Sequence, residues 1–132
     1  MIGLDTNVLV RYLVRDDKRQ AEKASAYIRE AISKGDCFYI NRLVLCELVW
    51  VLEASYGFNK KEIAGVLEKI LVTKQFEFEQ KEIVRQAVNG YAQGKGDFAD
   101  YLIGLINHES GCVRTVTFDR GLRNAPLFDV LD

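Results

Sequence analysis

The sequence of 132 residues has little of what several common classes of protein depend on. It contains one proline, one histidine and three cysteines. An odd number of cysteines, with no CxxC motif and no cysteine–histidine cluster, argues against a disulfide scaffold and a structural zinc site. We therefore expect Cys37, Cys46 and Cys112 to be buried thiols in a reducing compartment.

The chain also lacks a strong charge of one sign. Its 18 Lys+Arg against 19 Asp+Glu give a net charge of -1, without the basic excess typical of nucleic-acid binders. This balance does not exclude nucleic acid as a partner, because a bound divalent metal adds positive charge locally.

A long hydrophobic run is absent as well. The apolar start, MIGLDTNVLVRYLVR, is short, is interrupted by Asp5 and Arg11, and follows no basic segment. It predicts neither a signal peptide nor a membrane span. We expect a cytoplasmic protein that does not bind membranes.

What the chain does have is enough apolar material for one core. Hydrophobic residues make up 48% of the sequence, and its length is close to the commonest size of a single domain. No linker, low-complexity segment or repeat interrupts it. The sequence predicts one domain over residues 1–132.

Apolar spacing and helix-capping residues predict the order of the secondary structure. Helices are expected from Thr6 or Asn7 to about Leu13, from Asp16 or Asp17 to Gly35, and over about 41–55, 59–71, 80–92 and 97–111. Short strands are expected over 1–5, 37–40, 76–78 and 112–117, followed by a short helical segment and a final hydrophobic stretch. The first strand and 112–117 read as buried. Alternating strands and helices predict a three-layer α/β/α fold with a central, mostly parallel sheet.

One acidic residue stands out in the stretch LVLCELVWVL, where Glu47 is surrounded by apolar residues. A helix that is apolar nearly all round is buried. A buried carboxylate must be paired, be neutralised or bind a metal. The alternative to a metal is a buried ion pair with Arg42 or Arg11.

Other acids fall where the predicted strands end. Asp5 closes the first strand, and Asp119 follows the strand that ends at Thr117. Asp97 and Asp100, in GDFADYLIG, open a helix and share one of its faces. Because sites gather beyond the carboxyl ends of parallel strands, we expect these acids to meet Glu47 in one cleft. Each has a structural alternative, as a helix cap or a turn residue.

A protein tolerates a cluster of carboxylates only if a positive charge lies among them, because the carboxylates repel one another. No histidine or cysteine set accompanies them, and oxygen ligands alone favour Mg²⁺, Mn²⁺ or Ca²⁺. With Mg²⁺ or Mn²⁺ the usual chemistry is displacement at a phosphate.

At this point the chain resembles the PIN-domain ribonucleases, most closely the VapC-type toxins of toxin–antitoxin pairs. The matching pieces are LDTNVLV at 4–10, the helix with Glu47, DFADYLIG at 97–104 and VTFDRGL at 116–122. Their order and spacing span the whole chain.

The resemblance implies a fold, an activity and a set of site residues. The fold is an α/β/α domain with a central parallel sheet, and the activity is Mg²⁺- or Mn²⁺-dependent cleavage of RNA. The catalytic, metal-binding acids are Asp5, Glu47, Asp100 and Asp119, with Asp97 as an accessory metal ligand. Thr6, Asn7 and Thr117 are polar neighbours that would orient a carboxylate or water.

The resemblance also implies partners: an RNA, a small antitoxin protein and a second copy of the chain. Candidates to hold the RNA backbone are basic residues near the motifs, Arg11, Arg15, Arg42, Lys95, Arg114, Arg120 and Arg123. Trp50, Tyr56 and Phe58 are candidates either for an antitoxin groove or for the core.

Three other functions stay open on the sequence. One is a PIN-like RNA-processing nuclease without an antitoxin. Another is an enzyme that accepts a phosphoryl group on Asp5, as haloacid-dehalogenase-like phosphatases and receiver domains do; Asn7 stands where such phosphatases have a second aspartate. The last is a binding domain without catalytic activity.

Overall fold

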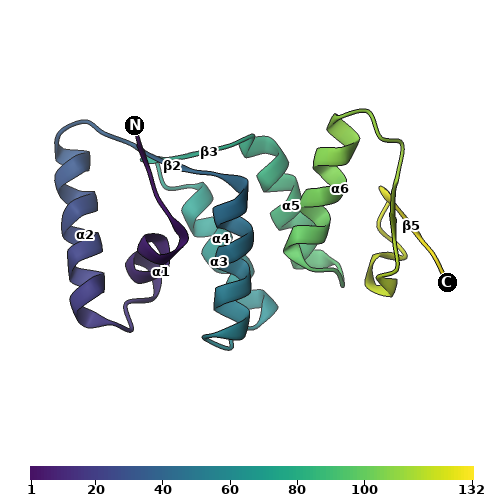
Figure 1. The fold of residues 1–132 in the computed structure, drawn as a ribbon, viewed down its shortest axis with the longest axis horizontal. Helices are drawn as coiled ribbons and strands as arrows, with labels where there is room; N and C mark the ends of the chain where they lie inside the picture. Colours follow the sequence, from purple (N-terminus) through teal and green to yellow (C-terminus); the bar gives the residue numbers. More distant parts are fainter.

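In the computed structural model, which describes residues 1–132, strands and helices follow one another in the predicted order (Figure 1). The helices are α1 (Thr6–Val14), α2 (Lys18–Ser33), α3 (Arg42–Ala54), α4 (Lys60–Leu71), α5 (Lys81–Gln93) and α6 (Phe98–Glu109). The strands are β1 (Ile2–Gly3), β2 (Phe38–Ile40), β3 (Phe76–Phe78), β4 (Thr115–Thr117) and β5 (Phe128–Val130), with a 3-10 helix, η1 (Arg120–Leu122), between the last two.

Local capping chemistry explains why the helices begin where they do. Asp17 accepts a hydrogen bond from the Gln20 N–H at 3.0 Å. Asn41 does the same for Val44 at 2.9 Å. Side chains of this kind satisfy backbone donors that the first turn of a helix leaves free. The predicted starts of α2 and α3 are therefore confirmed.

The five strands form two parallel sheets. One has the order β1-β2-β3, and the other is the pair β4-β5. The register aligns Ile2 with Phe38 in the first sheet and Thr115 with Phe128 in the second. The predicted α/β class and parallel pairing are confirmed. The expected single sheet is divided, because β4 does not pair with β1.

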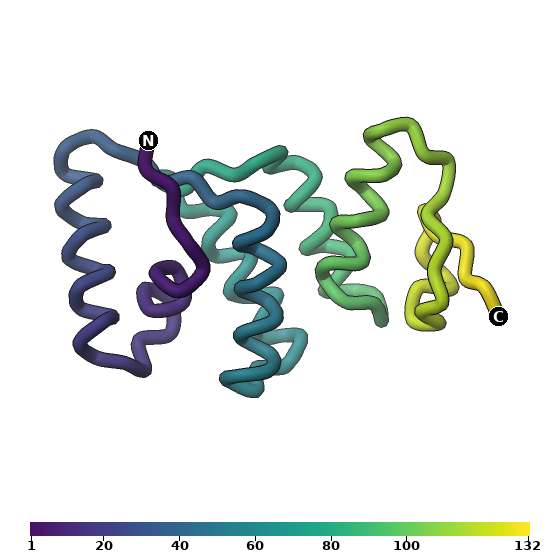
Figure 2. Tube along the Cα trace, viewed as in Figure 1, coloured from purple at the N-terminus to yellow at the C-terminus, as the bar shows by residue number.

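The β4–β5 pair is docked on α6 through two close approaches to glycine. A side-chain carbon at Gly104 would lie 2.6 Å from the Phe128 ring, and one at Gly96 would lie 2.5 Å from Leu122. Phe128 and Leu122 are buried there. Figures 1 and 2 show the result: the pair lies at one end of the long axis, beyond α6, whereas β1 lies between α2 and α3.

Three predictions of burial are wrong as a consequence of this arrangement. Gly3 of β1 is exposed, and Val116 of β4 is 61% exposed, because neither strand has a neighbour on its second edge. Cys112 is exposed in the loop before β4, whereas Cys37 and Cys46 are half-buried; all three thiols are free. None of the helices is both long and apolar enough to span a membrane.

Lys60 connects the first half of the chain to the turn before α6. Its ammonium donates to the carbonyl oxygens of Gly94 at 2.8 Å and Gly96 at 3.1 Å, and lies 4.5 Å from the centre of the Tyr91 ring. We expect Lys60→Ala to lower the free energy of unfolding by about 1–3 kcal/mol, because two partly buried carbonyl groups lose their partner. Urea unfolding measures this.

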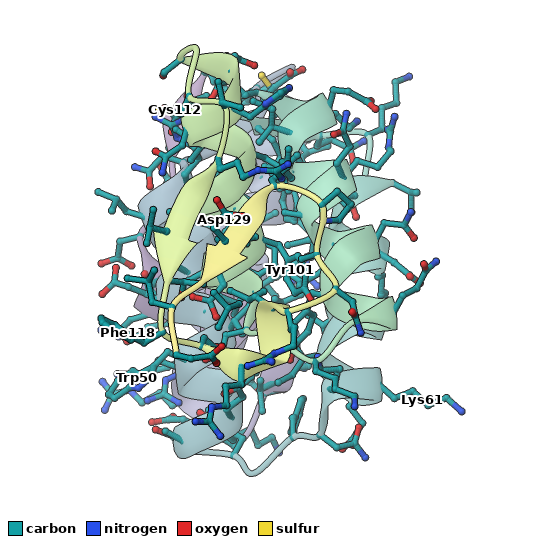
Figure 3. The ribbon with its side chains drawn as sticks, turned by 90° about the vertical axis from the view of Figure 1, so that its right-hand side faces the viewer. Trp50, Lys61, Tyr101, Cys112, Phe118 and Asp129 are labelled. Carbon is teal, nitrogen blue, oxygen red and sulfur yellow. The ribbon has the colours of Figure 1, made fainter.

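The neighbouring lysine is the control. Lys61 projects into solvent (Figure 3) and has no ion-pair partner. We expect Lys61→Ala to change the free energy of unfolding by less than about 0.5 kcal/mol. Equal losses in the two variants would contradict a structural role for the Lys60 contacts.

Candidate functional site

The first group of acids, Asp5 and Glu47, lies at the connection between β1 and α1. Asp5 follows the strand and accepts a hydrogen bond from the Val8 N–H at 3.0 Å, which makes it the N-cap of α1. The next residue, Thr6, donates its hydroxyl to Glu47 at 2.9 Å. The position of Asp5 at the start of α1 and the hydrogen bond from the adjacent Thr6 thus bring Asp5 and Glu47 to the same region. Thr6 orients a carboxylate, as expected.

Glu47 is exposed, and the prediction of a buried carboxylate is wrong. The core-facing side of α3 is formed by Val44, Leu45, Leu48, Val49 and Leu52. Glu47 lies on the other side with Leu43 and Trp50, which are 76% and 67% exposed. Positions 43, 47 and 50 share one face of a helix. The stretch LVLCELVWVL is apolar on two sides of α3: one packs in the core, and the other is exposed to solvent.

The alternative ion pair for Glu47 is also absent. Arg42 bonds Glu79 at 3.0 Å, and Arg11 bonds Asp16 at 3.0 Å. The free carboxylate oxygen of Glu47 is therefore available to a ligand from outside the chain.

The second group of acids lies around the start of α6. Asp100 accepts a hydrogen bond from the Asp97 N–H at 3.2 Å. Asp119, after β4, accepts one from the Gly121 N–H at 2.8 Å, while its own N–H donates to the Thr117 hydroxyl at 3.1 Å. The docking of β4–β5 on α6 brings Asp119 to Asp100.

Burial raises the pKa of Asp100, and the negative charges of Asp97 and Asp119, with a hydrogen bond to Asp119, raise it further. The hydrogen bond from the Asp97 backbone acts in the opposite direction. A carboxyl group next to two others holds its proton more tightly, because a second negative charge there is unfavourable. This position would therefore favour a cation.

The five predicted site residues are thus divided between two groups. Asp5 and Glu47 form one, and Asp97, Asp100 and Asp119 form the other. No three acidic, histidine or cysteine side chains lie close enough together to hold a metal ion. The residues of a single chain, as arranged here, do not fit the expected metal.

Most of the basic candidates for RNA binding already have partners within the chain. Arg15 donates to the Ser25 hydroxyl, Arg114 approaches Asp129, and Arg123 approaches Asp132. Lys95 and Arg120 have no ion-pair or hydrogen-bond partner on their side chains. They lie in the segments that precede Asp97 and follow Asp119.

Tyr101 supports the turn beside the acids, a role that the sequence analysis missed. Its hydroxyl accepts the Gly96 N–H at 3.1 Å, which fixes the turn that leads into Asp97. Figure 3 shows Tyr101 lying inward, behind the β4–β5 pair. Its position directly after Asp100 in DFADY was the available signal.

The sequence also matches known proteins. The sequence profile of the PIN domain matches residues 2–126. The chain belongs to the PIN domain family. A VapC ribonuclease of Aquifex aeolicus (strain VF5) is 31% identical over 117 residues, which are 89% of this chain and 86% of that protein. No solved structure matches the chain significantly. Membership of the PIN domain family confirms the resemblance and the α/β/α fold class.

The raised pKa of Asp100 predicts a pH-dependent effect of Asp100→Asn. Because the folded pKa lies above the unfolded one, the contribution of Asp100 to stability is fully present below the ordinary aspartate pKa of 3.8 and is lost as pH rises through the folded value. Between pH 3 and pH 7, the free energy of unfolding of Asp100→Asn should therefore rise relative to wild type. Partial exposure limits this gain to less than about 1 kcal/mol.

Urea unfolding with EDTA at several pH values measures the difference. The exposed Glu77→Gln, which also exchanges a carboxylate for an amide, is the control and should show no such trend. A difference that is constant with pH in Asp100→Asn would show that the neighbouring carboxylates do not act on Asp100.

Proposed function

We propose that this chain is a metal-dependent endoribonuclease and the toxin of a toxin–antitoxin pair. The observation that carries the proposal is the 31% identity to a VapC ribonuclease over 89% of the chain. The acidic residues at the ends of β1 and β4, on α3 and at the start of α6 support it, because nucleases of this kind need carboxylates and no protein nucleophile.

The donor set suits Mg²⁺ or Mn²⁺, since Asp5, Glu47, Asp97, Asp100 and Asp119 offer only hard oxygen ligands. Such a metal, when bound, would supply positive charge to the attacked phosphate. Because the acids stand in two groups within one chain, neither group alone offers a complete set of metal ligands. What the chain itself supplies is the acid pair Asp5–Glu47, oriented by Thr6.

Two basic side chains are suited to hold RNA. Lys95 and Arg120 flank the group around Asp100 and carry no internal ion pair. Contacts of this kind bind phosphate oxygens without reading sequence. They also offset the negative charge that the acids present to an incoming RNA backbone.

The toxin role in the cytoplasm, with a small antitoxin as partner, is inferred from the similarity to a VapC ribonuclease. The exposed face of α3 supports a protein partner, because Leu43 and Trp50 present large apolar side chains on either side of Glu47. An antitoxin that covers this face and places a basic side chain at Glu47 would block the site. Tyr56 and Phe58, the other candidates for such a groove, pack against the core instead.

The nuclease activity is tested with labelled single-stranded RNAs and tRNAs. We expect cleavage with Mg²⁺ or Mn²⁺, none with EDTA, and a loss of about 10²–10³-fold in Asp5→Asn and in Asp119→Asn, because each removes a carboxylate that would help to hold the metal that stabilises charge on the phosphate. Glu77→Gln is the control and should cleave as wild type does. Full activity of Asp5→Asn in folded protein would contradict the proposal.

The toxin role is tested separately by expression. The wild-type chain should stop growth, Asp5→Asn should not, and co-expression of the adjacent small reading frame should restore growth and give a purified complex. In that complex, Trp50→Ala should weaken binding by more than about 1 kcal/mol, as truncation of a central aromatic contact does. Cleavage without toxicity or complex would favour an RNA-processing nuclease.

A further inference from the structure

Two turns carry the second group of acids, and these turns touch each other. The turn 94–96 leads into Asp97 and α6, and the turn after β4 begins at Asp119. A side-chain carbon at Gly121 would lie 2.9 Å from the backbone oxygen of Lys95. The N–H of the same glycine donates to Asp119 at 2.8 Å. A shift of the turn 94–96 would therefore move Asp119 as well as the start of α6.

Tyr101 restrains the turn 94–96 from the side of α6. Its hydroxyl accepts the Gly96 N–H at 3.1 Å. Its ring lies against Gly90 of α5, where an added side-chain carbon would come within 2.8 Å of the ring. Tyr101 directly follows Asp100 on α6. Because the hydroxyl ties the turn to the helix that the turn starts, it limits how far Asp100 can move.

Lys60, the first residue of α4, restrains the same turn from another part of the chain. Its ammonium donates to the backbone oxygens of Gly94 at 2.8 Å and Gly96 at 3.1 Å. These two carbonyl groups flank Lys95, so one ammonium holds both ends of the turn. None of the ion pairs of the chain involves Lys60. The donors of this ammonium are therefore directed at the backbone of one turn.

Tyr91 fixes the position of the Lys60 ammonium. The ammonium lies 4.5 Å from the centre of the Tyr91 ring, within the range of a cation–π attraction. Tyr91 is 2% exposed, and its hydroxyl donates to Glu53 of α3 at 3.3 Å. Burial, then the charge and hydrogen bond of Glu53, raise the pKa of Tyr91 to about 12, with a further contribution from the charge of Asp97. The phenol stays protonated at neutral pH and joins Lys60 to the helix that carries Glu47.

We propose that Lys60 is a positioning residue for Asp100 and Asp119. Its hydrogen bonds go to neither acid, and it acts through the turn 94–96, which Tyr101 restrains at the other end. Lys60 lies outside every motif that relates the sequence to ribonucleases, and the folded chain alone brings it to the acids. The role in cleavage rests on the proposed function, whereas the restraint of the two turns does not.

A positioning role and a purely structural role differ in the behaviour of folded protein. A purely structural contact changes the fraction of chains that are folded and leaves the rate of each folded chain as it was. Misplacement of reacting groups by about 1 Å costs on the order of 10²-fold in rate, even when the cause lies far from the chemistry. The rate of fully folded variants therefore distinguishes the two roles.

Two variants release the turn from different sides. Lys60→Met keeps an apolar stem and removes the donors, and Tyr101→Phe keeps the ring against Gly90 and removes the hydroxyl. In the cleavage assay with folded protein, we expect each to lower kcat by about 10–100-fold. KM for RNA should change by less than about twofold, because the residues suited to bind RNA are intact. An unchanged kcat in Lys60→Met would overturn the proposal.

Two controls separate position from charge and from stability. Lys61→Met removes the same group from the next residue, which projects into solvent (Figure 3), and should cleave as wild type does. Ile28→Val removes a buried methyl group from α2, which lies at the far end of the molecule from β5 (Figure 1), and lowers stability there. Its kcat should also equal that of wild type. A fall in kcat as large in Ile28→Val as in Lys60→Met would contradict a positioning role.

Amide hydrogen exchange, followed by NMR in EDTA, tests the restraint without any activity. The Gly96 and Gly121 amides should exchange several-fold faster in Lys60→Met than in Ile28→Val, because opening of the turn 94–96 releases both. The Val44 N–H, at the capped start of α3, is the reference and should exchange alike in both variants. Unaltered exchange at Gly121 would refute the link between the two turns. If folded wild type cleaves no RNA, the proposed function fails, and the exchange rates alone decide whether Lys60 holds the turns.

Discussion

The docking of the β4–β5 pair on α6 is the contact on which the rest of the structure depends. Phe128 and Leu122 fill spaces that exist only because positions 104 and 96 are glycine. This contact fixes Asp119 next to Asp100 and leaves β1 with an open edge. This one packing arrangement therefore places Asp100 and Asp119 together and separates them from Asp5 and Glu47. It also uncovers the apolar strand that ends at Thr117.

The acids illustrate how functional groups use ordinary structural positions. Asp5 caps α1, Asp100 accepts a backbone N–H at the start of α6, and Asp119 closes the turn into η1. These roles were the structural alternatives to a site, and the structure shows that they hold. They do not exclude a site, because each backbone hydrogen bond engages one carboxylate oxygen, and the other can contact a further group, as the hydrogen bond between Asp100 and Asp119 shows. Capping instead fixes the direction in which the free oxygen points.

The sequence predicted the elements well because their signals are local. Asn41 and Asn59 mark helix starts within four residues of the hydrogen bonds they make. The burial of β1 and β4 was predicted wrongly, because it depends on which strand lies alongside, and no local pattern records that. The burial of Glu47 was also predicted wrongly, for a related reason. An apolar helix is buried only if every face finds a cover, and one face of α3 has none within the chain.

The acids and the uncovered apolar side chains lie near each other on the surface. Asp97 and Asp119 raise the pKa of Asp100, because a further negative charge beside them is unfavourable. A cation near Asp100 would relieve this repulsion, and anything that binds only the folded chain stabilises it. Leu43 and Trp50 leave an apolar surface on the face of α3 that carries Glu47. A partner that covers this face would therefore also reach the carboxylate that Thr6 holds.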